Sequence, residues 1–211
     1  MGMSMPYELT GRTDQKTRTR NALIDAAREL LAEGLTPTVE QAAAAAAISR
    51  TTAYRYFANQ RSLLVAAHPE TEATSLLADD APEDGEARFA LAVAALTDLV
   101  VNTEPQLRAM LRLALEPPAG EGEGEQLLRQ GRAIGWLAEA LAPLRDRVSE
   151  PALRRLVLAT RSSCGIESLV WLTDVAGLAR EDAAEMMLWS ARALLVSAVA
   201  DSPRRPGHVS P

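Results

Sequence analysis

Four side chains that can hold a phosphate or a base edge lie close together within residues 49–57: Arg50, Thr51, Tyr54 and Arg55. On a helix that turns about 100° per residue, these four fall within roughly 140° of arc. The small and apolar residues Ala53 and Phe57 lie on the other side. One face is therefore cationic and hydrogen-bonding, which suits a helix whose back packs on a partner while its front enters the major groove of DNA.

The residues before this segment predict a second helix that positions it. Thr38 is a good N-cap residue, and Gln41 three positions later completes a capping box. The alanine run at 42–47 has the strongest helix propensity available, and Ser49 is a second N-cap candidate. We therefore expect a helix, a tight turn and a second helix. The alternative interpretation is an ordinary αα-hairpin with solvated arginines, since a helix-turn-helix pattern alone is weakly specific.

The order of residue types is more specific, because over roughly residues 17–66 it closely resembles the DNA-binding signature of TetR-family transcriptional regulators. The matching positions are Thr38, Val39, Ala43, Ala46, Ile48, Ser49, Thr52, Tyr54, Arg55, Tyr56, Phe57, Asn59, Leu63 and Leu64. The resemblance implies a homodimer that binds a pseudo-palindromic operator, usually represses, and responds to a small molecule in its C-terminal body.

The sequence departs from the family pattern at several positions. The family usually has glycine in the turn where Ala47 stands, and often isoleucine and leucine where Ala42 and Ala53 stand. If the turn needs a positive φ, alanine at this position costs about 1 kcal/mol. A lysine that commonly touches phosphate in the family is Gln60 here, with Arg61 beside it as a substitute.

The helical wheel and the resemblance together predict the DNA contacts. The predicted set is Lys16, Arg18, Arg20, Thr38, Ser49, Arg50, Thr51, Thr52, Tyr54, Arg55, Tyr56, Gln60 and Arg61. We expect Arg50 to contact a base or a phosphate, and Tyr54 to contact a phosphate. Tyr56 is ambiguous, because the wheel turns its ring inward while the family places the hydroxyl at a phosphate. The basic stretch around Lys16 has an alternative interpretation as a solvated tail.

The charge distribution supports a nucleic-acid partner for the N-terminal part only. The chain of 211 residues has a net charge of −6, but residues 1–67 carry eight Lys and Arg against six Asp and Glu, a net +2. The single cysteine, Cys164, cannot form an intrachain disulfide and fits a reducing cytoplasm. We expect no signal peptide and no membrane span, since no apolar run approaches 18 residues.

The predicted fold is all-α, with an N-terminal three-helix DNA-binding head and a C-terminal helical bundle. We place the head at 1–66 (ordered from about 16, with its first helix at 17–33), the regulatory and dimerisation body at 67–201, and a disordered tail at 202–211. The helices expected in the body span 87–102, 104–115, 126–148, 151–176 and 180–200. A mobile loop rich in Pro, Gly and Glu is expected at 116–125, and Pro143 is expected to end or bend its helix.

The last two helices are apolar on more than one side, which predicts a dimer seam rather than a purely internal helix. The seam candidates are Leu156, Leu169, Trp189 and Leu194. A ligand pocket is also predicted, because small residues beside a large ring leave space. Its candidate wall is Phe89, Met110, Trp136, Cys164, Glu167 and Trp171. The alternative to the seam is a central helix in a monomer. The alternatives to the pocket are a fully packed core and, for the polar residues around Cys164 and Glu167, intrahelical contacts or a polar patch at the dimer seam.

The sequence contains no G-x-S-x-G, P-loop, H-E-x-x-H or C-x-x-C motif, and one of its two histidines lies in the tail. We therefore predict a regulator rather than an enzyme, with no cofactor and no metal. Two alternatives remain: a DNA-binding protein that needs no ligand, and a helical ligand-binding protein or enzyme whose head no longer binds DNA.

Overall fold

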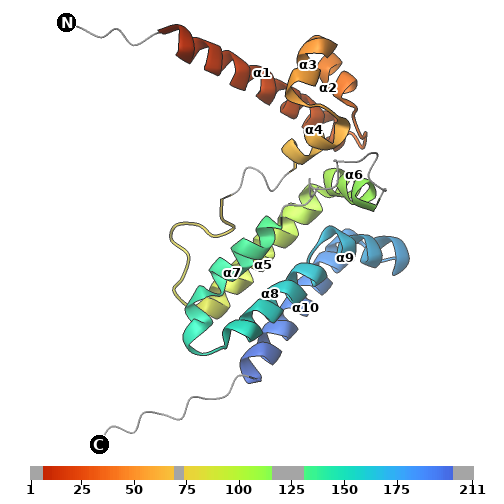
Figure 1. Ribbon diagram of the computed structural model, residues 1–211. Coiled ribbons are helices and arrows are strands. Elements are labelled where there is room, and N and C mark those ends of the chain that lie inside the picture. The colour runs from red at the N-terminus through yellow and green to blue at the C-terminus, as the bar shows by residue number, and fades with distance from the viewer. Residues whose placement is uncertain (1–6, 69–73, 116–130, 202–211) are drawn as a thin grey trace, which may run out of the picture. The chain divides into compact units, whose positions relative to one another are not determined.

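The computed structural model describes residues 7–68, 74–115 and 131–201, with side chains from residue 14 onward. Within these ranges the chain is helical and contains no strand, so the predicted all-α fold is confirmed (Figure 1). The chain forms two compact units. The head unit holds the residues up to 71 together with those from Pro105 to Arg129, and the body unit holds the residues between 72 and Glu104 and those from 130 onward.

The head unit contains α1 (Tyr7–Ala32), α2 (Val39–Ala45), α3 (Arg50–Tyr56), α4 (Gln60–Ala66) and most of α6 (Glu104–Leu115). Its core takes residues from each of these helices: Leu23, Ile24, Ala27, Leu31, Val39, Ala42, Ala43, Ala53, Phe57, Leu63, Leu64, Ala67 and Ala109. The spacing of Leu23, Ala27 and Leu31 is the four-residue stripe of one helix face. Arg28 Nε donates a hydrogen bond of 3.3 Å to the Ala67 carbonyl, which ties α1 to the end of α4.

The body unit is built on α5 (Gly85–Asn102), α7 (Arg132–Ala140), α8 (Glu150–Ser163) and α10 (Arg180–Ala200). Each of the four packs against two others, because α10 contacts α8 and α5 while α7 contacts α5 and α8 (Figure 1). The shorter elements are η2 (Ala142–Asp146), α9 (Ile166–Val170) and η3 (Trp171–Val175). A helical bundle with an apolar interior results, as predicted for this part of the chain.

Several predicted boundaries agree with the structure. Both α6 and α10 have the predicted bounds, and α8 begins with Pro151 at its second position. The helix before Pro143 ends at Ala140 and continues as the tighter η2. The predicted loop at 116–125, the helix start at 126–130 and the tail at 202–211 lie outside the described residues.

Two predictions about helices are wrong. The tail expected through residue 15 is helical from Tyr7, as the first part of α1. No proline interrupts this segment, although Thr10, Gly11, Thr13 and Asp14 have low helix propensity. The single helix expected from Pro151 to Gly177 breaks at Cys164 and Gly165. At this break the Arg161 guanidinium and the Glu167 carboxylate occupy the place of a Gly165 side chain, and Ser168 Oγ donates 2.8 Å to the Ser162 carbonyl.

By length and composition, α10 is the one described helix apolar enough to cross a membrane, with a mean hydropathy of 1.3. Only 22% of its apolar window is buried within the chain. Because α10 packs against α5 and α8 in the bundle, its composition is that of a bundle helix with a second apolar face, and it does not by itself indicate a membrane.

Candidate nucleic-acid interface

Two capped helices and a short turn present α3 to solvent. Thr38 Oγ1 accepts from the Gln41 backbone N–H at 3.2 Å, while Gln41 Oε1 accepts from the Thr38 N–H at 2.8 Å, so the predicted capping box is confirmed. Ser49 Oγ accepts from the Thr52 N–H at 3.2 Å, and Ser49 is the predicted N-cap of α3. These side chains satisfy helix donors that would otherwise lack partners, each stabilising its helix by about 1 kcal/mol.

The turn between α2 and α3 contains the one described non-glycine residue with a positive φ, Ala47 at 54°. The Ile48 N–H reaches back to the Ala43 carbonyl at 2.8 Å, so the turn closes directly on α2. Behind α3, Ala53 is fully buried against a core that includes Ala42. Because Ala47 has a left-handed backbone conformation and the buried residues Ala42 and Ala53 are small, α2 and α3 can approach closely. Their close packing determines the direction of the outward face of α3.

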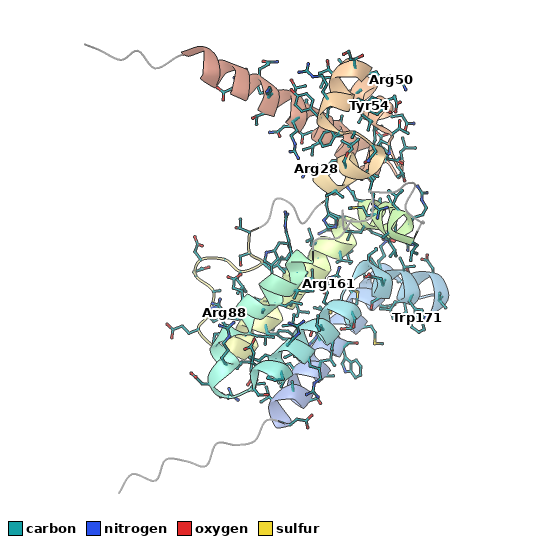
Figure 2. The ribbon with its side chains drawn as sticks, in the orientation of Figure 1. Arg28, Arg50, Tyr54, Arg88, Arg161 and Trp171 are labelled. Atoms are coloured by element: carbon teal, nitrogen blue, oxygen red, sulfur yellow. The ribbon has the colours of Figure 1, made fainter. Side chains whose placement is uncertain are left out.

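That outward face carries the four residues of the predicted arc, all of them exposed: Arg50, Thr51, Tyr54 and Arg55. The Arg50 side chain is 74% exposed, and Figure 2 shows it beside Tyr54 at the edge of the head unit. An exposed row with two guanidinium groups, a threonine hydroxyl and a phenol is suited to phosphates and base edges.

One contact on this face involves a residue that the sequence analysis missed, Glu40 on α2. The Tyr54 hydroxyl donates to Glu40 Oε1 at 2.6 Å, and Arg50 Nη2 lies 3.0 Å from the same oxygen. The Arg50 guanidinium also lies 5.7 Å from the centre of the Tyr54 ring. The hydrogen bond from Tyr54 lowers the pKa of the Glu40 carboxyl, and the same bond raises the pKa of Tyr54.

Thr52, Tyr56 and Gln60 make contacts within the head unit in the free protein. Ser49 Oγ donates to the Thr52 hydroxyl at 2.9 Å. Gln60 Nε2 donates to the Thr36 and Pro37 carbonyls at 3.1 and 3.0 Å, so this amide holds the chain segment before α2. Tyr56 is half-buried and packs against the head core, in agreement with the inward direction given by the helical wheel.

The remaining basic residues of the predicted set lie on α1 and α4. Lys16, Arg18 and Arg20 are exposed on α1. Arg61 on α4 is half-buried, and its Nε has no hydrogen-bond partner among the described residues. Their roles as DNA contacts stay predictions, since no nucleic acid is present in the structure.

The predicted pocket residues of the body unit have different environments. Phe89 and Trp136 are buried, and Trp136 Nε1 donates 2.9 Å to the Thr74 carbonyl. Glu167 is exposed and pairs with Arg161 at 3.7 Å, while Trp171 is 58% exposed on η3. Met110 is buried in the head unit. The proposed common wall therefore stays a prediction.

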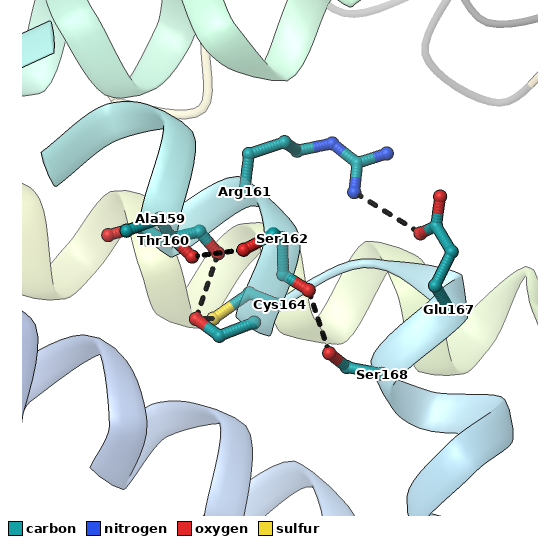
Figure 3. A network of polar contacts seen from close by, with 8 residues as sticks. Ala159, Thr160, Arg161, Ser162, Cys164, Glu167 and Ser168 are labelled. Carbon is teal, nitrogen blue, oxygen red and sulfur yellow. Dashed lines mark hydrogen bonds and ion pairs between the residues drawn. The ribbon is translucent and has the colours of Figure 1, made fainter. Parts of the chain in front are cut away.

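Cys164 lies fully buried in the polar network at the end of α8 (Figure 3). Its Sγ donates to the Met187 carbonyl at 3.4 Å and lies 3.7 Å from the Ser163 hydroxyl. Burial raises the pKa of the Cys164 thiol. This thiol ties the end of α8 to α10. No cluster of three or more metal-ligating side chains occurs in the part of the chain that the structure describes.

The four residues predicted for the dimer seam differ in their exposure to solvent. Leu156 and Leu169 are buried within the chain itself, Leu194 is half-buried, and Trp189 is 64% exposed. A partner chain could contact the last two without any rearrangement of the bundle.

Comparisons with known proteins agree with this geometry. Residues 23–67 match the profile of the family described as bacterial regulatory proteins, tetR family. The structure of the SmeT–triclosan complex is similar over 92% of this chain and 98% of that chain, with a TM-score of 0.55 and 19% identity, which shows a shared fold. No curated protein matched the sequence.

The capped helix pair, the outward face of α3 and the match over residues 23–67 define a helix-turn-helix transcription regulator that binds DNA. Residues 23–67 therefore form a DNA-binding domain like that of the tetR family of bacterial regulatory proteins, and the chain as a whole shares its fold with SmeT.

Proposed function

We propose that the protein is a homodimeric repressor that binds a pseudo-palindromic operator and is released from it by a small molecule. The DNA-binding part of the proposal is supported by the outward face of α3, where Arg50, Thr51, Tyr54 and Arg55 are exposed together. Helices α2 and α3, which position this face, are both N-capped by side chains. Arg50 is the candidate for a guanine edge or a phosphate, and Tyr54 is the candidate for a phosphate.

The dimer part of the proposal is supported by the two apolar faces of α10. Ala183, Met187, Ala191 and Leu195 are buried at four-residue spacing, and they face the bundle. Met186, Trp189 and Val196 are 43%, 64% and 69% exposed. At about 100° per residue, this second group lies roughly opposite the first.

A second copy of this chain is the occupant that fits the exposed face of α10. A groove of about 220 Å³ runs between α8 and α10 and is lined partly by small residues, including Ala152, Ala159 and Ala198. Small residues let the helices of a partner approach closely, and an isologous contact would bury the exposed Trp189 of both copies. Two heads related by a two-fold axis would then read two half-sites one helical turn apart, about 34–36 Å.

The effector part of the proposal is supported by the structural similarity to SmeT and by the grooves of the body unit. SmeT forms a complex with triclosan, and we propose that a small, largely apolar molecule binds the body of this protein. The predicted wall around Trp136 is one candidate location. A groove of about 220 Å³ between α7 and α8, lined by Ile134, Leu141, Leu153 and Val157 among others, is a second. We propose that the protein acts in the cytoplasm, where operator and effector meet.

The DNA-binding proposal is tested by selection. The full-length protein is incubated with a pool of randomised duplexes, and retained sequences are amplified and counted. We expect enrichment of one motif with two inverted halves, and binding of that duplex in fluorescence anisotropy. Retention of duplexes without any enriched motif would indicate a non-specific DNA-binding protein, and no retention would indicate a head that does not bind DNA.

The effector proposal is tested by linkage. Small apolar compounds are screened by tryptophan fluorescence, and each hit is titrated with and without the selected duplex. A ligand that lowers operator affinity tenfold must itself bind about tenfold more weakly to the DNA complex, a coupling of roughly 1.4 kcal/mol. Hits that bind equally well in both states would remove the release mechanism from the proposal and leave the DNA-binding part intact.

A further inference from the structure

Glu40 places a carboxylate on the face that is proposed to meet a polyanion. Its Oε1 accepts from the Tyr54 hydroxyl at 2.6 Å and lies 3.0 Å from Arg50 Nη2. The Glu40 side chain is 36% exposed, so it is not hidden beneath its partners. The two residues with the strongest claim to contact DNA are therefore both held by an acidic residue from the neighbouring helix.

A negative charge here is unfavourable for DNA binding as such. Most non-specific affinity comes from cations that neutralise phosphates and release counterions. Glu40 opposes this in two ways: it repels phosphates, and it occupies the Arg50 guanidinium. For fold stability the contact adds little, because exposed ion pairs contribute on the order of 0.2–1 kcal/mol. Glu40 also lies in the first turn of α2, where a negative charge stabilises the helix. That effect does not require the contacts with Arg50 and Tyr54, and DNA affinity does not explain them either.

Specificity does account for it. An unrestrained arginine on a long, flexible side chain can reach a phosphate on any sequence, whereas a held guanidinium keeps one direction. The Glu40 contact to Arg50, the Tyr54 hydroxyl and the stacking of Arg50 on the Tyr54 ring at 5.7 Å together restrict that direction. Discrimination between sequences is a difference of affinities, and it rises when binding to the wrong partners is penalised.

We propose that Glu40 is a specificity-determining residue, which restrains Arg50 and Tyr54 so that they engage the operator but are less available to the phosphates of arbitrary DNA. The proposal rests on the proposed DNA-binding function. Glu40 acts through Arg50 and Tyr54, so it is a positioning residue, and its effect is on the ratio of operator to non-operator affinity.

The test compares wild type with Glu40→Gln on the selected duplex and on a scrambled duplex of the same composition. Glutamine keeps the size of the side chain and an oxygen that can accept from Tyr54, but it removes the charge. We expect the affinity for scrambled DNA to rise about threefold or more, with a salt dependence steeper by about 0.9 in log–log slope if Arg50 gains one phosphate. Operator affinity is expected to change less, so the specificity ratio falls.

Two further variants distinguish the effect of Glu40 on the position of Arg50 from the effect of removing one negative charge from the head unit. Glu33→Gln removes the same charge from an exposed residue that follows α1, whereas Glu40 is the acid that pairs with Arg50, and we expect Glu33→Gln to leave the ratio unchanged. In an Arg50→Ala background, Glu40→Gln is expected to have a much smaller effect on scrambled DNA. A spectroscopic titration of tyrosine provides a check on the contact itself, because Glu40→Gln is expected to lower the raised pKa of Tyr54.

The outcomes are distinguishable from failure of the proposed function. If wild type selects no operator, the DNA-binding proposal fails before Glu40 is tested. If wild type selects an operator and Glu40→Gln keeps the wild-type ratio, or if Glu33→Gln lowers the ratio equally, the specificity role of Glu40 is overturned. A fall in operator affinity alone, with scrambled DNA unchanged, would instead assign Glu40 to direct operator contact. Thermal unfolding of each variant confirms that the fold is retained.

Discussion

The guanidinium of Arg20 on α1 lies 5.4 Å from the ring centre of Phe57, the residue that ends α3. Phe57 is itself buried in the head core. A cation over an aromatic ring contributes about 0.5–1 kcal/mol at an exposed site. Arg20 therefore links α1 to the end of α3, so the exposed Lys16 and Arg18 of α1 have a defined position relative to the DNA-facing helix.

The outward face of α3 gives the first prediction. Arg50→Ala and Tyr54→Ala are each expected to weaken operator binding by about 1–3 kcal/mol, the usual cost of a lost base or charged phosphate contact. Both side chains are exposed, so stability should change by no more than about 0.5 kcal/mol. Fluorescence anisotropy with the selected duplex measures the first effect, and urea unfolding measures the second.

A basic residue on the body unit provides the control for this pair. Arg154 is exposed on α8, and Arg154→Ala removes one positive charge from outside the head. We expect Arg154→Ala to bind operator as wild type does. Wild-type affinity in both α3 variants would show that DNA is contacted by another surface.

Ala47 gives a prediction about stability. At φ 54°, its Cβ is crowded by the backbone, and glycine would relieve this strain. We expect Ala47→Gly to stabilise the protein by about 1 kcal/mol, which raises Tm by roughly 2–4 °C for a chain of this size. Ala45→Gly, in the last helical position of α2, is the control and is expected to destabilise by about 0.5–1 kcal/mol. A lower Tm for Ala47→Gly would mean that the turn tolerates alanine without strain.

The exposed face of α10 gives a prediction about assembly. Sedimentation at micromolar concentration should give twice the chain mass of 22.6 kDa. Val196→Asp is expected to give a monomer, because it places a charge on the exposed apolar face of α10 that forms the proposed seam, where Val196 is 69% exposed. Leu91→Asp makes the same change on α5, where Leu91 is 50% exposed, and should leave the dimer intact. A wild-type monomer would rule out the seam.

Cys164 gives a prediction about pH. Burial raises the pKa of its thiol above the ordinary value for cysteine, so the folded state holds the proton more tightly than the unfolded chain does. The corresponding stability is present below about pH 9 and is lost as the pH rises through the interval between the two pKa values. Iodoacetamide should label the folded protein slowly at pH 8 and the urea-unfolded chain rapidly. Rapid labelling of folded protein would show that the α8–α10 contact opens readily.

The parts of the fold that depend on neighbours in sequence could be predicted. The capping box of Thr38 and Gln41 and the cap at Ser49 need only residues three apart, and they appear as expected. The amphipathic division of α3 follows from its periodicity, and its buried member Ala53 lies where the wheel places it. The bounds of α10 were also predictable, since Gly177 precedes a long run of helix formers.

The parts that depend on tertiary contact could not be predicted. The break at Gly165 interrupts a continuous apolar periodicity, and the Arg161 and Glu167 side chains lie where a side chain at Gly165 would be, which only the folded chain reveals. Glu40 resembles a favourable acid in the first turn of a helix, and its contact with Tyr54 depends on how α2 and α3 cross. The grouping of α6 with the head likewise reflects packing between segments far apart in the sequence.

The use of alanine for the buried residues between α2 and α3 has a consequence for how such a regulator changes over evolutionary time. Ala42, Ala43 and Ala53 are all buried, and an alanine has no side-chain rotamer to readjust. The spacing of the two helices is therefore insensitive to substitutions on the exposed side of α3. We expect new operator preferences to arise by exchange of residues such as Thr51 or Arg55 alone, without compensating changes in the core, so that recognition can drift while the scaffold stays constant.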